Sequence, residues 1–393
     1  MVGVRHHRTG LVAFLCVSVL AACSSRPDPG HAPAASTPPP FQFSAARAQE
    51  GLDALVQHYN AIGGIVAVSV GGGTPTILTS GVAPSTGTPL QPDVRVFVAS
   101  LSKLFVGALT LRLVDEHRVD LDASLASYGI DWRDGDTITV RMLLEHTSGI
   151  PPLGGDRGGP DQYQPDFSSL VSRDPSHRFT IDEILAFAHD RPNLFSPGTS
   201  TSYTNLDTIL AAKVDELATG ETITRLLHDR ILDPLHLDHT TYVPVEGAGA
   251  GAGAITSTID NDAFLTALGP AGAVATDASD LMTFANAFLH DRTLVSPTSE
   301  TLATTISAGG TGAGTLGFGG FNRHDNFCIF LDSGCRPGTV FSGVGGSGSI
   351  PGVSTILVDD KASDTVVFVY AFRQGVPCEF LAHAIWFNEQ LRF

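Results

Sequence analysis

Apolar runs typical of β-strands occur near both ends of the 393-residue chain. The run from Ile65 to Val70 is followed by a glycine-rich turn at Gly71 to Gly73 and by a second strand that ends at Gly81. This pattern predicts a hairpin near the start of the folded region. Past Gly309, four more predicted strands are separated by glycine and polar turns: Thr315 to Phe321, Thr339 to Gly343, Val353 to Asp359 and Thr365 to Phe372.

The middle of the chain has the spacing of helices instead. The longest helical stretch runs from Ser100 to Val114. We expect further helices over Ala45 to Tyr59, Thr139 to His146, Ile181 to Ala188, Asp207 to Thr219, Thr222 to Leu232, Ser279 to Leu289 and Phe380 to Leu391. Strands at 60–98 and 310–375 therefore flank a helical region at 100–305, which predicts an α/β (α+β) fold whose sheet is built from both ends of the chain.

Ser100 and Lys103 form an S-x-x-K pair at the start of the longest helix. A serine hydroxyl is a weak nucleophile at neutral pH and needs a base within hydrogen-bond reach. If Ser100 lies in the first helical turn, Lys103 falls on the same face, and the free N–H groups of the helix N-terminus favour developing negative charge. The alternative is a helix cap beside a solvated lysine. The other two lysines, Lys213 and Lys361, do not repeat the pair.

Tyr203 and Asn205 stand two residues apart just before a predicted helix. Alternate residues of an extended segment point the same way, so both side chains can enter one cleft. Tyrosine can act as an acid or base, and asparagine can hydrogen-bond a carbonyl group. The alternative is a turn with a buried tyrosine and a capping asparagine. We interpret His146, in the last turn of another predicted helix, as a structural residue that bonds helix carbonyls.

The N-terminus has the pattern of a targeting segment. A positive region at Arg5 to Arg8 precedes an apolar run at Leu11 to Leu20, which ends on small residues and Cys23. This pattern resembles a bacterial lipobox, in which Cys23 would carry the lipid; the alternative is an ordinary cleaved signal peptide. We predict a lipoprotein signal at 1–22, a linker rich in proline, serine and alanine at 23–41, and one folded domain at 42–393.

The formal net charge of −17 argues against nucleic-acid binding and against a polybasic membrane patch. Two cysteines, Cys328 and Cys335, flank a predicted turn and are the disulfide pair that we favour, which leaves Cys378 free. The cysteine spacing does not indicate a metal site, and we expect no cofactor.

Several stretches together resemble the serine β-lactamase and penicillin-recognising superfamily, in its class C-like branch of esterases and D-amino-acid peptidases. They are Ser100-Leu101-Ser102-Lys103, Leu143 to Ile150, Tyr203-Thr204-Asn205, Pro234-Leu235 with Thr240, Gly269 to Val274 and Asp280-Leu281. The resemblance extends from about Ile65 to Phe372. It implies an antiparallel sheet flanked by helices, with an inserted all-helical region.

The resemblance also implies roles for individual residues. Ser100 would attack an acyl carbonyl, and Lys103 and Tyr203 would share the proton transfers. Asn205 would hold the substrate carbonyl. The family's third motif matches the glycine-rich stretch from Gly345 to Gly352, which we expect to lead into the strand predicted from Val353. The backbone N–H groups of Ser100 and of Ser349, which follows Gly348 in this motif, would form the oxyanion hole.

The third motif departs from the family pattern at Gly346, where the family carries lysine or histidine. Glycine cannot bind the carboxylate that β-lactams and D-Ala peptides present, whereas an ester without a carboxylate is less affected. We therefore predict a serine hydrolase of esterase type. The alternatives are a β-lactamase or D,D-carboxypeptidase and a non-catalytic envelope binding protein.

We expect the protein to act on a small ester or peptide-like substrate as a monomer. It would be exported and held at the cell membrane by a lipid on Cys23, facing the periplasm or cell wall.

Overall fold

The computed structural model of the protein describes residues 41–152, 171–246, 255–259, 262–304, 315–316, 322–325, 342–386 and 391. Residues Phe41–Phe393 belong to one compact unit. Cys23, Cys328 and Cys335 lie outside the described residues, so lipidation and the disulfide stay predictions. Cys378 is buried and its thiol is free. None of the described helices combines the length and the apolar character needed to cross a bilayer.

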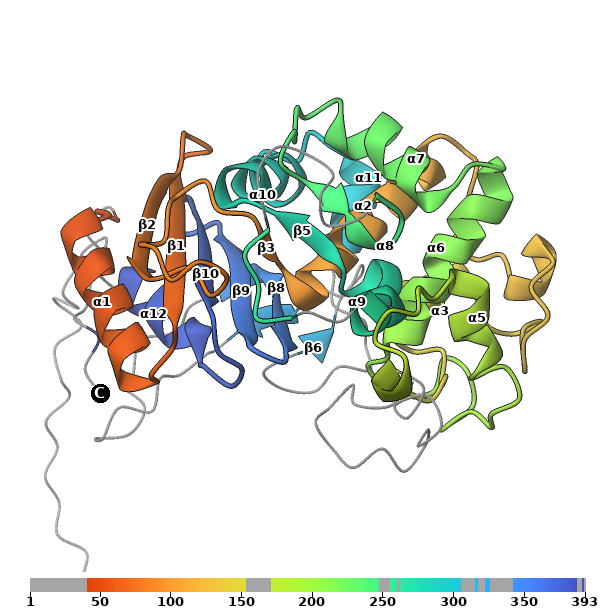
Figure 1. The fold of residues 1–393 in the computed structure, drawn as a ribbon. Coiled ribbons are helices and arrows are strands. Elements are labelled where there is room, and N and C mark those ends of the chain that lie inside the picture. The colour runs from red at the N-terminus through yellow and green to blue at the C-terminus, as the bar shows by residue number, and fades with distance from the viewer. Residues whose placement is uncertain are drawn as a thin grey trace, which may run out of the picture. The chain divides into compact units, whose positions relative to one another are not determined.

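Both ends of the chain contribute to one antiparallel sheet, as the sequence predicts (Figure 1). The two ends meet where β1 (Gly63–Val70) pairs with β10 (Thr365–Ala371), and Ile65 lies opposite Tyr370. The seven strands follow the order β2 (Thr76–Gly81), β1 (Gly63–Val70), β10 (Thr365–Ala371), β9 (Val353–Asp360), β8 (Ser342–Ile350), β7 (Asn322–Asp325) and β6 (Thr315–Leu316).

The two faces of this sheet are buried in two separate cores. Alternate residues of a strand point to opposite faces, so β1 sends Ile65 to one core and Val66 to the other. Helices α1 (Ala45–His58) and α12 (Cys378–Trp386) cover the face of Val66. Helices α2 (Ser102–Asp115) and α10 (Ala278–Ala285) cover the opposite face, next to the helical region (Figure 1). The sheet is therefore the middle layer between two layers of helices.

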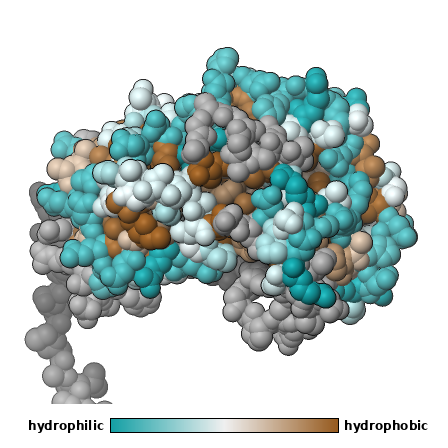
Figure 2. All heavy atoms as spheres, viewed as in Figure 1, coloured by the Kyte–Doolittle hydropathy of each residue, from teal (hydrophilic) through white to brown (hydrophobic). Residues whose placement is uncertain are grey.

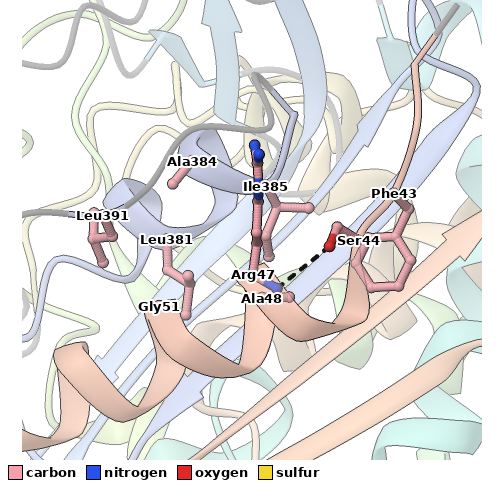
Figure 3. Close-up of a pocket in the computed structure, with 9 residues that line it drawn as sticks. All are labelled: Phe43, Ser44, Arg47, Ala48, Gly51, Leu381, Ala384, Ile385 and Leu391. Atoms are coloured by element: carbon pink, nitrogen blue, oxygen red, sulfur yellow. Dashed lines mark hydrogen bonds between the residues drawn. The ribbon is translucent and has the colours of Figure 1, made fainter.

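Helices α1 and α12 pack closely where Gly51 faces Leu381 (Figure 3). A Cβ atom at Gly51 would lie 2.6 Å from the Leu381 side chain, so glycine permits this approach. Ser44 caps the N-terminus of α1, and its hydroxyl accepts a hydrogen bond from the Arg47 N–H at 3.4 Å. The cavity between the two helices measures about 10 Å³, which is room for one water molecule at most.

The predicted helices of the middle region form, most of them with shorter or divided spans, whereas α6 (Asn205–Thr219) begins two residues earlier than predicted, at Asn205. Side chains of threonine or aspartate cap several of them, including Thr180, which forms a reciprocal capping box with Glu183. The predicted helix over Thr222 to Leu232 is divided into a helix and a π-helical turn. The helical elements of this region are η2 (Leu125–Tyr128), α3 (Val140–Leu144), α5 (Ile181–Ala186), α6 (Asn205–Thr219), α7 (Ile223–Leu227), η3 (His228–Leu232), α8 (Val243–Glu246), α9 (Asp262–Leu268), η4 (Gly269–Ala271), η5 (Asn286–His290) and α11 (Pro297–Thr304).

Three parts of the strand prediction are incomplete. Strand β7 (Asn322–Asp325) begins just after the strand expected over Thr315 to Phe321 and was not predicted. A second, three-stranded sheet joins β3 (Val96–Phe97), β5 (Val274–Thr276) and β4 (Thr241–Tyr242), and its strands are too short for a sequence pattern to reveal. The strand expected to end at Gly343 continues to Ile350. The glycine-rich stretch that we expected to lead into a strand is therefore itself a strand, because its backbone pairs with β9 along its length.

On the face drawn in Figure 2, hydrophilic residues cover most of the helical half. Hydrophobic residues gather in the middle of this face, between the sheet and the helical region.

Candidate active site

Ser100 lies in a single 3₁₀ turn, η1 (Ala99–Leu101), which leads directly into helix α2. The preceding residue, Ala99, has a φ of +50°, in the left-handed region that alanine rarely adopts. Such backbone strain persists only where the surroundings impose it, and it is often found at active sites. One of the surrounding contacts is the hydrogen bond from the Val98 N–H to the Val274 carbonyl at 3.1 Å, which ties this turn to the small sheet.

Lys103 is buried and lies within hydrogen-bond distance of Ser100. Its Nζ is 3.3 Å from Ser100 Oγ, 2.7 Å from Asn205 Oδ1 and 2.7 Å from the carbonyl oxygen of Ala271. It also lies 4.8 Å from the centre of the Tyr203 ring. The first three atoms accept hydrogen bonds, so each can take one of the three protons of an ammonium group.

Tyr203 completes a compact group of four side chains. Its hydroxyl oxygen is 2.8 Å from Ser100 Oγ and 3.4 Å from Asn205 Oδ1. Thr204, between the two residues, is extended with φ −148° and ψ 143°, and it caps helix α6. The extended residue turns Tyr203 and Asn205 to the same side, as the alternation of side chains requires. The structure thus brings together Ser100, Lys103, Tyr203 and Asn205.

Strand β8 passes directly beside the serine turn. A Cβ atom at Gly348 would lie 2.9 Å from the Ser100 backbone nitrogen and 2.9 Å from the Val98 carbonyl oxygen. Only glycine permits two backbone segments to approach so closely. Ser349, the next residue, is exposed at this edge.

Gly346 faces apolar side chains of η1 and α2 and not a polar pocket. A Cβ atom at Gly346 would lie 3.2 Å from a methyl group of Leu101 and 3.7 Å from one of Leu104. Both leucines are buried. The place where the family pattern has a cationic side chain is therefore bordered by apolar groups.

His146 is buried, but it does not bond helix carbonyls as we expected. Its Nδ1 lies 2.9 Å from a carboxylate oxygen of Asp207, in the first turn of helix α6. The expectation was wrong about the partner because Asp207 is distant in sequence and is brought to His146 by the packing of α3 on α6. Sequence reasoning missed Asp207 and the Ala271 carbonyl; the only sequence signal for Asp207 was its position two residues after Asn205.

One group of side chains in the described residues has a spacing compatible with a metal ion. Potential ligand atoms of His239, Asp277 and Asp280 lie within 4.8 Å of one another. Asp277 accepts a hydrogen bond from the Asp280 N–H at the start of helix α10, and Asp280 accepts one from the His239 N–H. The hydrogen bond to Asp277 raises the pKa of His239. These contacts give the cluster a structural role as the cap of α10.

A cavity of about 450 Å³ opens elsewhere, beside Trp132, Leu185 and Lys213. Lys213 is paired with Asp182 at 2.7 Å. The cavity contains no serine or cysteine and none of the four grouped side chains. We therefore place the candidate active site at Ser100, on the basis of its chemistry.

An antiparallel sheet with a serine, lysine and tyrosine in mutual contact defines a class of serine hydrolases. Residues 52–385 match the family model described as "Beta-lactamase", and the chain belongs to the β-lactamase family. The fold predicted from the sequence is confirmed.

Known relatives and solved structures agree with this assignment. The chain is 27% identical over 265 residues to penicillin-binding protein 4 of Amycolatopsis lactamdurans, covering 63% of this chain and 65% of that protein. It is 28% identical over 205 residues to a D-aminopeptidase of Brucella anthropi, covering 52% of this chain and 37% of that protein. The chain thus spans less than two thirds of the length of either relative. A D-stereospecific amidohydrolase from Streptomyces sp. has a similar fold, with a TM-score of 0.70, 24% identity and coverage of 88% of this chain and 99% of that one.

Proposed function

We propose that the protein is a serine hydrolase that forms an acyl-enzyme on Ser100. The observation that carries this proposal is the position of Ser100 Oγ, which is 2.8 Å from the Tyr203 hydroxyl and 3.3 Å from Lys103 Nζ. A serine hydroxyl becomes a good nucleophile when a neighbouring group can take its proton. The Tyr203–Lys103 pair can take this proton when the pair itself lacks one, either as a phenol beside a neutral amine or as a phenolate beside an ammonium group.

The proposed reaction has two stages. In the first, Ser100 Oγ attacks the acyl carbonyl while its proton passes to the Tyr203–Lys103 pair. The same pair then protonates the leaving group. In the second stage, water attacks the acyl-enzyme and Ser100 regains its proton. The oxyanion would accept hydrogen bonds from the backbone N–H groups of Ser100 and Ser349, each worth about 3–4 kcal/mol in the transition state.

Asn205 has a double role in this scheme. Its Oδ1 accepts a hydrogen bond from Lys103 at 2.7 Å, which fixes the ammonium group near Ser100. With Oδ1 turned toward Lys103, the amide nitrogen is the atom that would donate to the substrate carbonyl.

The surroundings of Gly346 favour a substrate without a carboxylate beside the scissile bond. A carboxylate needs a cation or several hydrogen-bond donors to replace its water shell. Position 346 has no side chain and borders Leu101 and Leu104. We therefore propose a neutral ester, or a related amide, as the substrate class. The names of the relatives, a D-aminopeptidase and a D-stereospecific amidohydrolase, are compatible with acyl transfer from an amide.

The first test is reaction with a fluorophosphonate probe, followed by turnover of a short-chain p-nitrophenyl ester. We expect the wild type to be labelled at Ser100 and Ser100→Ala to lose both labelling and turnover while keeping its melting temperature. Undiminished turnover by the variant would refute the assignment of the nucleophile. If the wild-type protein does not react with the fluorophosphonate probe, the result would support the alternative that it is a non-catalytic binding protein.

A second assay separates the substrate classes. We expect the ester to be hydrolysed far faster than the chromogenic β-lactam nitrocefin, because position 346 supplies no cation. Rapid nitrocefin hydrolysis, or stable labelling by a fluorescent penicillin, would favour a β-lactamase or D,D-carboxypeptidase instead.

We also propose that the protein is exported and anchored through a lipid on Cys23. The support is the sequence pattern of a short apolar run that ends on small residues and cysteine. The test is metabolic labelling with a clickable fatty acid and partition into detergent. Cys23→Ser should lose the label and move to the aqueous phase, and a label retained by that variant would contradict the proposal.

A further inference from the structure

A buried pair of side chains lies behind Tyr203 and has no part in the reaction described so far. The imidazole of His146 is 1% exposed, and its ring centre lies 4.9 Å from that of Tyr203 at an angle of 45°. Its Nδ1 donates to the Asp207 carboxylate at 2.9 Å. In the part of the chain that the structure describes, its Nε2 has no hydrogen-bond partner. The ring orientation is therefore fixed from the Asp207 side.

The Asp207 carboxylate joins two elements of the site. It is fully buried and also accepts a hydrogen bond from the Ser148 hydroxyl at 2.6 Å. A buried carboxylate is costly unless it is paired and hydrogen-bonded, so these contacts are needed for it to remain there. Asp207 lies two residues after Asn205 in the first turn of α6. It therefore holds the turn at 146–149 against the helix that carries Asn205.

The backbone of the same turn holds the loop that carries Tyr203. His146 has a φ of +54°, and its carbonyl accepts the Ser202 N–H at 2.9 Å, immediately before Tyr203. The carbonyl groups of Thr147 and Gly149 accept the N–H groups of Gly198 and Leu194, each at 2.8 Å. The backbone of His146, which is held in a strained conformation, thus fixes the loop that carries Tyr203. Its side chain packs against the phenol ring of Tyr203.

We propose that His146 and Asp207 are positioning residues that hold Tyr203 in hydrogen-bond contact with Ser100. This inference rests on the proposed function, in which Tyr203 takes part in proton transfer. Misplacing a reacting group by about 1 Å can cost about 100-fold in rate. Removing the support should therefore slow acylation, even though neither residue touches Ser100.

The test uses His146→Asn in the full-length protein. The asparagine Nδ2 takes the place of the histidine Nδ1 and can still donate to Asp207. Asparagine, like histidine, is one of the non-glycine residues that most readily adopt a positive φ. The substitution thus removes mainly the ring that packs against Tyr203. We expect kcat/KM for the p-nitrophenyl ester to fall by about 10- to 100-fold.

The chain offers a matched control in His290. Its Nδ1 lies 2.8 Å from the Asp359 carboxylate, and the two side chains are 7% and 1% exposed. This pair joins η5 to strand β9 and resembles the pair behind Tyr203 in distance and burial. His290→Asn should lower the melting temperature to a similar extent and leave kcat/KM unchanged. An equal loss of kcat/KM in both variants would show a general effect on stability and overturn the proposal.

A second readout does not depend on activity. With 3-fluorotyrosine incorporated, the ¹⁹F resonance of Tyr203, assigned by its absence in Tyr203→Phe, reports the surroundings of the phenol. His146→Asn should shift or broaden it, and His290→Asn should not. If the wild type proves inactive, the proposed function fails, but this resonance still tests the positioning.

Asp207→Asn provides a second variant if His146→Asn does not fold. It keeps the shape of the side chain but retains only one acceptor oxygen for two donors. It should give the same shift of the Tyr203 resonance and the same direction of change in kcat/KM. An unchanged resonance together with an unchanged kcat/KM, in a folded variant of either residue, would refute the proposal.

Discussion

Replacing Gly348 by alanine tests how closely strand β8 must approach the nucleophile. The added Cβ would lie 2.9 Å from the Ser100 nitrogen, from the Val98 oxygen and from a methyl group of Thr355. Ordinary van der Waals contact begins near 3.4 Å, so the strand and the turn must separate by about 0.5 Å. Two of the three neighbours are backbone atoms, which cannot rotate away as a side chain could.

The size of the effect follows from the role proposed for the neighbouring Ser349 N–H. Active-site groups must be held within about 0.5 Å of their working geometry. Loss of one oxyanion donor lowers kcat by about 100- to 1,000-fold. We therefore expect Gly348→Ala to lower kcat by about 100-fold. Overpacking should also cost about 1–3 kcal/mol of unfolding free energy.

The assay is the kcat for the p-nitrophenyl ester, measured beside the melting temperature. The matched control is Gly346→Ala in the same strand, where the nearest neighbour is the flexible end of Leu101 at 3.2 Å. That methyl group can move, so the control should keep kcat within about threefold. An unchanged kcat in Gly348→Ala, or an equal loss of kcat in both variants, would refute the proposal that the Ser349 N–H of strand β8 binds the oxyanion.

Three further predictions concern single side chains. Tyr203→Phe removes the hydroxyl beside the nucleophile and should lower kcat about 100- to 10,000-fold at an unchanged melting temperature; a smaller loss would exclude it from proton transfer. Burial raises the pKa of Asp215 well above its usual value, although the Thr110 hydroxyl donates to it. The folded protein therefore binds that proton more tightly than the unfolded chain, and stability is lost as the pH rises from about 4 through the raised pKa. The melting temperature of Asp215→Asn relative to wild type should increase over this range, and a constant difference would contradict the burial argument. The hydrogen bond to Asp277 raises the pKa of His239, so its contribution to stability is complete below about pH 6.5 and is lost above the raised pKa. His239→Gln should therefore weaken the dependence of the melting temperature on pH above about pH 6.5. A pH dependence equal to that of the wild type would contradict a stabilising contact between His239 and Asp277.

Most of the sheet and the four grouped side chains could be predicted because their signals are local. The apolar run at Ile65 to Val70 and the spacing of Ser100 and Lys103 each lie within a few residues. The partnership of His146 with Asp207 could not be predicted in the same way. These residues are 61 positions apart, and their contact depends on how two helices pack.

The extent of strand β8 could not be predicted from the sequence pattern either. Its glycines are typical of loops, because glycine weakens a strand by its conformational freedom. In this fold the pairing with β9 on one side and the approach of Gly348 to the Ser100 turn outweigh that preference. The requirement for glycine comes from a neighbour more than 200 residues away, so it leaves no mark on the local sequence.

The pairing of β1 with β10 determines when activity can arise during synthesis. These neighbouring strands are about 300 residues apart in sequence, a separation that makes their pairing a late event in folding. Strand β8 and its Ser349 are synthesised later than Ser100, which precedes Ser349 by 249 residues. A growing chain thus carries a nucleophile without the strand that would stabilise its transition state. Hydrolysis would begin only after strand β8 has been made and has joined the sheet, so the appearance of activity would report the assembly of the sheet.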